Sequence, residues 1–113
     1  MATSPNIGFT YAEEGVVTSE VAVNEALNIM DMLLQCAVID RNLATPPGSP
    51  ADGDVYLVAT SGTGAWSGKD GQIAGYYSGW IFYTPSEGFT MRVLDENLWL
   101  GWNGSTWNTF TVT

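Results

Sequence analysis

The sequence predicts an α+β fold in which an N-terminal arm and one long apolar helix precede a small antiparallel β meander, with copies joined through the helix. Three observations predict this fold. Residues 18–41 carry an amphipathic pattern that no glycine or proline interrupts. A connector rich in proline and glycine follows at 42–54. Short apolar segments separated by turn residues then fill 55–113.

Residues 1–17 show no sustained hydrophobic period and contain Pro5, Gly8 and Gly15. This composition predicts an extended arm of the kind that reaches a neighbouring chain. Thr18 or Ser19 is the expected N-cap of the helix, because a hydroxyl oxygen can accept a hydrogen bond from the first backbone amides. The helix is expected to end near residue 41, before the connector.

The predicted helix has more apolar surface than one small domain covers. Two adjacent rows of apolar residues recur at spacings of three and four, beside a single polar stripe of Asn24, Asn28, Asp31 and Gln35. In the simplest arrangement, one row packs on the β domain and the other on symmetry-related helices. A helix buried within one domain is the alternative. The residues expected at the oligomer interface are Val23, Ala26, Leu27, Met30, Leu33, Leu34 and Ala37.

The segment 55–113 is predicted to form a Trp-rich antiparallel β domain. Residues 55–59 read as a short apolar strand, and Asn103-Gly104 is the clearest hairpin turn. Side chains alternate between the two faces of a strand. Trp99 is therefore expected on the face opposite to Leu100.

The composition excludes several classes of function. Twelve acidic residues against three basic ones give a net charge of −9, which disfavours binding to nucleic acid and to anionic membrane surfaces. No apolar run is long enough for membrane insertion. The sequence has no histidine, which is the usual general base and the commonest zinc ligand. We therefore expect no enzyme activity, no catalytic residue, no metal and no cofactor.

A few residues could still carry chemistry. The carboxylate pairs Asp52/Asp54 and Asp95/Glu96 lie at predicted turns, where capping of backbone amides is the commoner role. The single cysteine, Cys36, lies in an apolar run and is expected to be a core thiol.

Five tryptophans all lie in the β half of the chain. Exposed indoles can stack on sugar rings, but a domain of this size needs most of its tryptophans in the core. Trp99 and Trp66 are the candidates for a contact to a glycan or to a protein partner. Trp66 is also expected to anchor the glycine-rich loop at 60–71.

Six segments form an ordered set of motifs: SPNIGF at 4–9, VNEAL at 23–27, ATPPGSPADGD at 44–54, TGAW at 63–66, GW at 79–80 and PSEG at 85–88. In this order they resemble an uncharacterised domain family found in alphaproteobacterial phages, prophages and gene transfer agents. The resemblance runs over nearly the whole chain. It implies a virion protein that forms part of a head spike, capsid fibre or tail fibre.

The function expected from this resemblance is that of a structural component of a phage or phage-like particle. The chain would be made in the host cytoplasm, reside in the virion and form a homotrimer by analogy with fibre proteins, with other virion proteins as partners. Because the sequence ends at Thr113, it is expected to act as a base, adaptor or stand-alone decoration. The alternative function is a glycan-binding module that contacts host surface polysaccharide.

Overall fold

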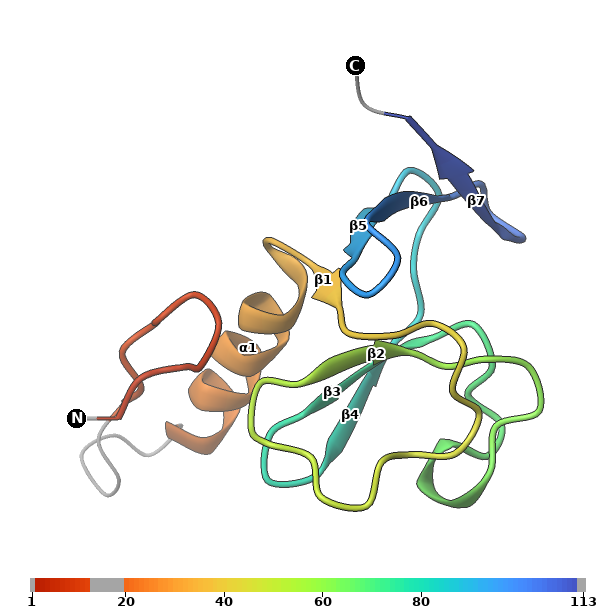
Figure 1. The fold of residues 1–113 in the computed structure, drawn as a ribbon. Helices are drawn as coiled ribbons and strands as arrows, with labels where there is room; N and C mark the ends of the chain where they lie inside the picture. The colour runs from red at the N-terminus through yellow and green to blue at the C-terminus, as the bar shows by residue number, and fades with distance from the viewer. Residues whose placement is uncertain (1, 13–19, 112–113) are drawn as a thin grey trace. The chain divides into compact units, whose positions relative to one another are not determined.

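The computed structural model describes residues 2–12 and 20–111. These residues form one α-helix, α1 (Glu20–Leu33), one short 3₁₀ helix, η1 (Gly64–Trp66), and seven strands in two sheets (Figure 1). The chain divides into two compact units, Met1–Gln35 and Cys36–Thr113. The described structure is mostly β, so the predicted fold with one long apolar helix and a single meander is wrong.

Helix α1 has 14 residues and ends well before the predicted end at residue 41. The two residues Ala37–Val38 form strand β1, which pairs in parallel with strand β5 (Thr90–Val93). The predicted interface residue Ala37 therefore lies in a strand of the second unit. The expected N-cap residues, Thr18 and Ser19, lie outside the described residues.

The early end of the helix has a physical cause in backbone pairing. The N–H of Arg92 donates to the carbonyl of Cys36, and the N–H of Leu94 donates to the carbonyl of Val38. On the other side, the N–H of Ile39 donates to the carbonyl of Val55 at 2.8 Å. These bonds satisfy the backbone from both sides, so an apolar run that would suit a helix is extended instead.

The N-terminal segment is a hairpin and not an extended arm. Thr3 and Thr10 form an antiparallel bridge, and the N–H of Ser4 donates to the carbonyl of Phe9 at 2.8 Å. The hairpin lies beside α1 in the same unit (Figure 1). This segment, for which the sequence predicted an extended arm, therefore folds against its own helix.

The polar stripe of α1 holds this hairpin. Asn24 exchanges two hydrogen bonds with the backbone of Ala12, at 2.8 and 3.2 Å, and Asn28 accepts one from the Tyr11 hydroxyl. Asp31 is almost completely buried and accepts hydrogen bonds from Ser4 and from backbone amides of the hairpin. Asn24, Asn28 and Asp31 therefore bind polar groups of the hairpin, and the apolar residues lie on the other faces of the helix.

The first sheet of the second unit is antiparallel and contains β2 (Val55–Leu57), β3 (Ile73–Tyr76) and β4 (Trp80–Tyr83), in that order. Its core includes Tyr56, Val58, Trp66 and Ala74. The Trp66 ring packs 5.7 Å from that of Tyr56 and 5.2 Å from that of Trp80, measured between centroids. Helix η1 thus anchors the glycine-rich loop by burying its tryptophan completely.

The second sheet has the order β1-β5-β6-β7, where β6 is Leu98–Trp102 and β7 is Trp107–Phe110. Strands β5, β6 and β7 are antiparallel neighbours. The turn between β6 and β7 follows the prediction, because the Asn103 side chain accepts hydrogen bonds from the backbone of Ser105 and Thr106. One face is buried through Val38, Met91, Val93 and Leu100.

Two side-chain contacts join segments of the second unit that lie far apart in sequence. The indole Nε1 of Trp107 donates to the carbonyl of Gly71 at 2.9 Å, which ties β7 to the loop before β3. Arg41 pairs with Glu96 in the turn between β5 and β6. The connector at 42–54 contains neither helix nor strand.

Candidate functional site

The apolar surface of α1 is the first candidate site. Three large apolar side chains of α1 are exposed: Val23 (43%), Ile29 (44%) and Met30 (41%). Leu34, which directly follows the helix, is also exposed (61%). They follow spacings that place them on adjacent rows of one broad face, on the side of the helix away from the polar stripe. Soluble monomers rarely expose a contiguous set of large apolar side chains.

The seven residues predicted for the oligomer interface lie in both units of the chain. Val23, Ala26, Met30 and Leu34 are exposed on the first unit, and Leu27 and Leu33 are half-buried there. Ala37 is the exception, since it belongs to β1. Six of the seven predicted residues therefore lie in the unit of α1 and retain access to solvent.

The open face of the four-stranded sheet is the second candidate site. Arg92, Trp99 and Phe110 are direct cross-strand neighbours on β5, β6 and β7. The Arg92 guanidinium on β5 lies 5.4 Å from the centroid of the Trp99 ring. On the other side of Trp99, the Phe110 ring on β7 has its centroid 6.4 Å from that of Trp99. The row exists because Trp99 alternates with the buried Leu100, as the sequence pattern predicts.

This row borders a surface hollow of about 230 Å³. Its lining residues are Arg92, Asn97, Leu98, Trp99, Phe110 and Thr111. Trp99 is thus available to a ligand at its partly exposed surface. Trp66 is 0% exposed, so it cannot contact a ligand in the folded chain, and its predicted role as a surface contact is wrong.

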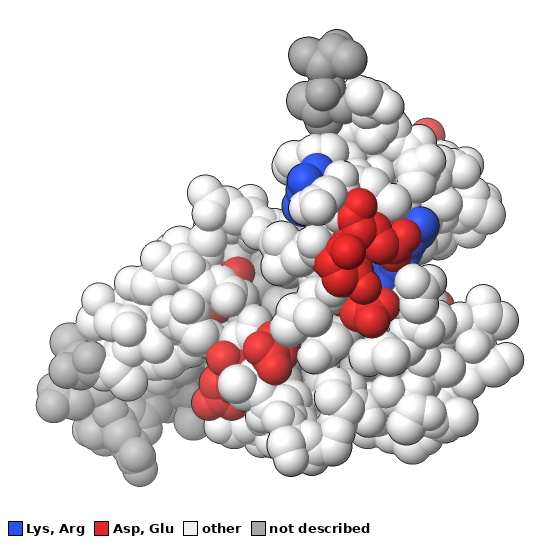
Figure 2. Space-filling view, viewed as in Figure 1, with Lys and Arg blue, Asp and Glu red and all other residues white. Residues whose placement is uncertain are grey.

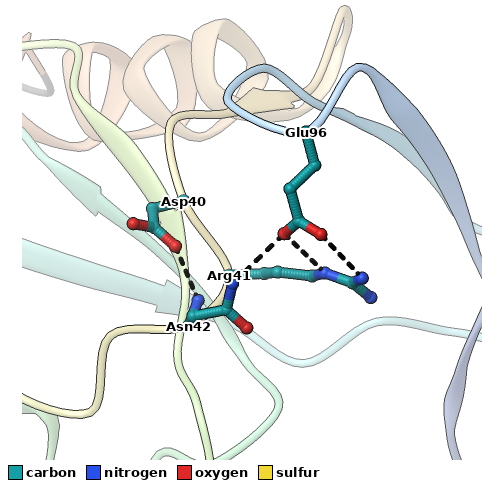
Figure 3. Close-up of polar contacts among 4 residues, drawn as sticks. All are labelled: Asp40, Arg41, Asn42 and Glu96. Atoms are coloured by element: carbon teal, nitrogen blue, oxygen red, sulfur yellow. Dashed lines mark hydrogen bonds and ion pairs between the residues drawn. The ribbon is translucent and has the colours of Figure 1, made fainter.

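A polar cluster in the second unit joins Arg41, Asn42 and Glu96 (Figure 3). Its Nε and Nη2 donate to the two carboxylate oxygens of Glu96, each at 2.9 Å, and Asn42 donates to Glu96 at 3.2 Å. The hydrogen bond from Arg41 lowers the pKa of Glu96, and the same bond raises the pKa of Arg41. Both charges are satisfied by each other, so this cluster ties two loops together and is not poised for proton transfer.

The acidic residues gather in clusters on the surface in view, and near the turn between β5 and β6 a basic group lies next to them (Figure 2). Several carboxylates cap turns. Asp52 accepts from the N–H of Ser78, and Asp54 accepts from the N–H of Ala51. Asp70 accepts from two backbone amides of the glycine-rich loop, and these bonds lower its pKa. The predicted capping role therefore describes Asp52 and Asp54.

Among the residues that the structure describes, no group of three or more metal-ligating side chains comes together. Cys36 is 7% exposed, and burial raises its pKa to about 12. The thiol is therefore protonated and unreactive at neutral pH, as expected for a core cysteine.

A larger hollow, of about 310 Å³, lies in the second unit beside Arg41, Leu57 and Trp107. Its polar groups already have partners, since Arg41 pairs with Glu96 and the Trp107 indole donates to Gly71. It offers a ligand few unsatisfied donors. Within residues 2–12 and 20–111, no helix combines the length and the apolar character that a membrane crossing requires.

Sequence reasoning identified Trp99 but not its neighbours Arg92 and Phe110. Alternation could have indicated them, because Arg92 lies between two apolar residues of β5 and is therefore on the same open face as Trp99. The pairing register was the missing information, and that register depends on turn geometry as well as on the apolar pattern.

A search of curated proteins found no match. A comparison with protein families found one match, to DUF2793, a family described as protein of unknown function, and the match covers residues 23–108. These residues include most of α1 and all but the last two residues of the seven strands. More than half of the chain is covered, and the chain therefore belongs to the DUF2793 family.

Proposed function

We propose that this chain is a non-enzymatic structural component of a phage or phage-like particle, and that it assembles as a homo-oligomer through the apolar face of α1. One observation carries the assembly part of the proposal, namely the exposure of Val23, Ile29, Met30 and Leu34 on a helix whose polar stripe already binds the N-terminal hairpin. Taking such a side chain from full exposure to full burial contributes about 1.5–3 kcal/mol, and these four are 41–61% exposed, so covering each one contributes part of that amount. Covering the face is therefore favourable.

The occupant that fits this face best is a second copy of the same chain. The chain carries a net charge of −9, so two copies repel each other unless they meet through an uncharged surface. The exposed row offers such a surface, because its large side chains are all aliphatic or thioether groups. A face of this kind can pack against its own symmetry mate without leaving a charge unpaired.

A trimer accounts for the width of the face better than a dimer. The apolar residues form two adjacent rows, and a helix in a three-helix assembly contacts one neighbour through each row. Helix α1 is about 21 Å long at 1.5 Å per residue, so one pair of helices buries little area compared with a standard interface. Two neighbours per helix increase that area.

The oligomeric state of the full chain tests the assembly. Light scattering coupled to size exclusion, or native mass spectrometry, is expected to give a trimer for the wild type and monomer for Leu34→Glu and Met30→Glu. Leu94→Glu is the matched control, because Leu94 is 51% exposed and lies in a turn of the second unit. A wild-type chain that remains monomeric at high concentration would overturn the assembly.

The particle assignment is supported by the ordered motifs at 4–9, 44–54 and 85–88 that resemble virion proteins. Mass spectrometry of purified particles tests it. The chain is expected in the particle fraction, in a fixed ratio to the major capsid protein, and retained after stringent washing. Its absence from particles that are produced while the chain is expressed would contradict the proposal.

A further inference from the structure

We propose that the hollow bordered by Arg92, Trp99 and Phe110 binds an acidic sugar, with the pyranose ring on the aromatic row and its carboxylate on Arg92. This inference is independent of assembly through α1, because every residue of the hollow belongs to the second unit. Three features carry it: an aromatic platform on an open sheet face, an arginine that has no carboxylate partner among the described residues, and an amide at the rim.

The platform is held by the sheet itself. Trp99 stands directly between Arg92 and Phe110 across three hydrogen-bonded strands, so their spacing is set by backbone pairing. The Phe110 ring lies over Gly101, where an added Cβ would be 3.5 Å from the ring carbons. That distance is an ordinary van der Waals contact, and the Phe110 ring is tilted by 36° to the Trp99 ring. Because strand pairing holds both rings at one place on the sheet, the aromatic surface is preorganised.

Arg92 supplies the charge. Arg41 of the same unit is paired with Glu96, whereas the described contacts of Arg92 are the Trp99 ring and a long hydrogen bond of 3.4 Å to the Asn97 amide oxygen. A guanidinium stacked on an indole keeps its N–H edge free to bind a carboxylate in bidentate fashion. None of the described residues that line the hollow is acidic, so the carboxylate of a ligand would meet no like charge from them.

The combination selects a sugar acid over other anions. A simple anion needs only Arg92, and it would leave the partly exposed Trp99 and the 40% exposed Phe110 without a role. A neutral sugar would use the rings and leave the cation unpaired. The net charge of −9 weakens binding only modestly, since charges farther away than about 8 Å are largely screened at physiological ionic strength.

Calorimetric titration of the full chain with an oligomannuronate and with a neutral cello-oligosaccharide of equal length tests the inference, with sodium acetate as a third probe. The wild type is expected to bind the oligomannuronate, to bind the neutral oligosaccharide more weakly and to show no binding of acetate alone. The affinity for the acidic probe is expected to fall as salt rises.

Variants separate the two parts of the site. Arg92→Gln is expected to weaken oligomannuronate binding at least about tenfold while leaving the neutral probe unchanged. Trp99→Ala is expected to weaken both probes, and Trp99→Phe to restore part of the loss. Lys69→Gln is the control with the same change of charge, because Lys69 lies over Phe82 on the other sheet. Near-ultraviolet circular dichroism checks that each variant is folded.

Three outcomes would overturn the proposal. The first is a folded wild type that binds neither oligosaccharide. The second is equal loss of acidic-probe binding in Lys69→Gln and Arg92→Gln, which would indicate a nonspecific charge effect. The third is undiminished binding in Trp99→Ala, which would place the ligand elsewhere. None of these depends on whether the chain forms a trimer.

Discussion

The hydroxyl of Ser4 donates a hydrogen bond of 2.5 Å to the carboxylate of Asp31, and both side chains are almost completely buried. The same hydroxyl accepts the N–H of Phe9 at 2.8 Å, while the carboxylate accepts the N–H of Ile7 at 2.5 Å. The pair therefore links the two sides of the N-terminal hairpin to the helix. A buried carboxylate is stable only with such partners.

Asp31→Asn is expected to loosen the hairpin from α1. The amide is a weaker acceptor, and its NH₂ group faces backbone N–H donors of the hairpin, so the docking loses about 1–3 kcal/mol. Amide hydrogen exchange across residues 3–11 of the full chain measures the effect. Glu25→Gln, at an exposed site on the same helix, makes the same change of charge and is expected to leave exchange unchanged. Equal protection in both variants would contradict this role of Asp31.

The Arg41–Glu96 pair predicts a dependence of stability on pH. The pKa of Glu96 is lower in the folded chain than in the unfolded chain, so the unfolded state takes up a proton at a higher pH. The stabilisation is complete above the pKa of an unfolded glutamate and is lost as pH falls through the lowered folded pKa. The effect is small and salt-sensitive because the pair is exposed.

Urea unfolding at neutral and acid pH measures this dependence. The wild type is expected to be more stable than Glu96→Gln at neutral pH, and the difference is expected to shrink on acidification. Glu87→Gln, at another exposed glutamate of the second unit, serves as the control. A constant difference between wild type and Glu96→Gln at all pH values would show that the carboxylate charge contributes nothing.

Gly62→Ala is expected to destabilise the second unit by about 1–3 kcal/mol, the usual cost of overpacking. An added Cβ would lie 2.4 Å from the backbone oxygen of Trp66, and backbone held by the buried Trp66 ring cannot move away easily. Thermal unfolding compares this variant with Gly48→Ala, where an added Cβ meets nothing within 4 Å. Similar melting temperatures for the two variants would be inconsistent with the described loop.

Trp66→Ala is expected to cost about 3–5 kcal/mol, since it removes a completely buried aromatic ring. Trp66→Phe is expected to cost much less, because the Trp66 Nε1 has no hydrogen-bond partner among the described residues and only volume is lost. Trp99→Ala, at a half-buried position, is expected to cost less than Trp66→Ala. Chemical unfolding followed by circular dichroism ranks the three, and a Trp99→Ala cost that exceeds that of Trp66→Ala would reverse the assignment of core and surface.

Local features of the second unit could be predicted from the sequence. The Asn103-Gly104 turn forms as predicted, with Gly104 at a φ of 99° that glycine adopts readily. Alternation also separated Trp99 from the core residue Leu100. Both depend on a residue and its immediate neighbours, and such information is present in the linear pattern.

The end of the helix could not be predicted in the same way. Residues 36–39 are apolar and contain no glycine or proline, so they suit a helix and a strand equally well. Pairing of Ala37 with Arg92, 55 positions later, decides between the two, and periodicity carries no information about that distant partner. The row of Arg92, Trp99 and Phe110 could not be predicted for the same reason, because it depends on the pairing register of three strands.

The sequence by itself determined which residues are polar and apolar along α1, where the main turns lie, and that histidine-dependent chemistry is absent. Only the tertiary structure decided that the polar stripe binds the N-terminal hairpin, that Trp66 lies in the core, and that Ala37 and Val38 form a strand instead of continuing the helix. The reason is physical. Those outcomes depend on which distant backbone groups and side chains satisfy one another, and that competition is settled when the chain packs.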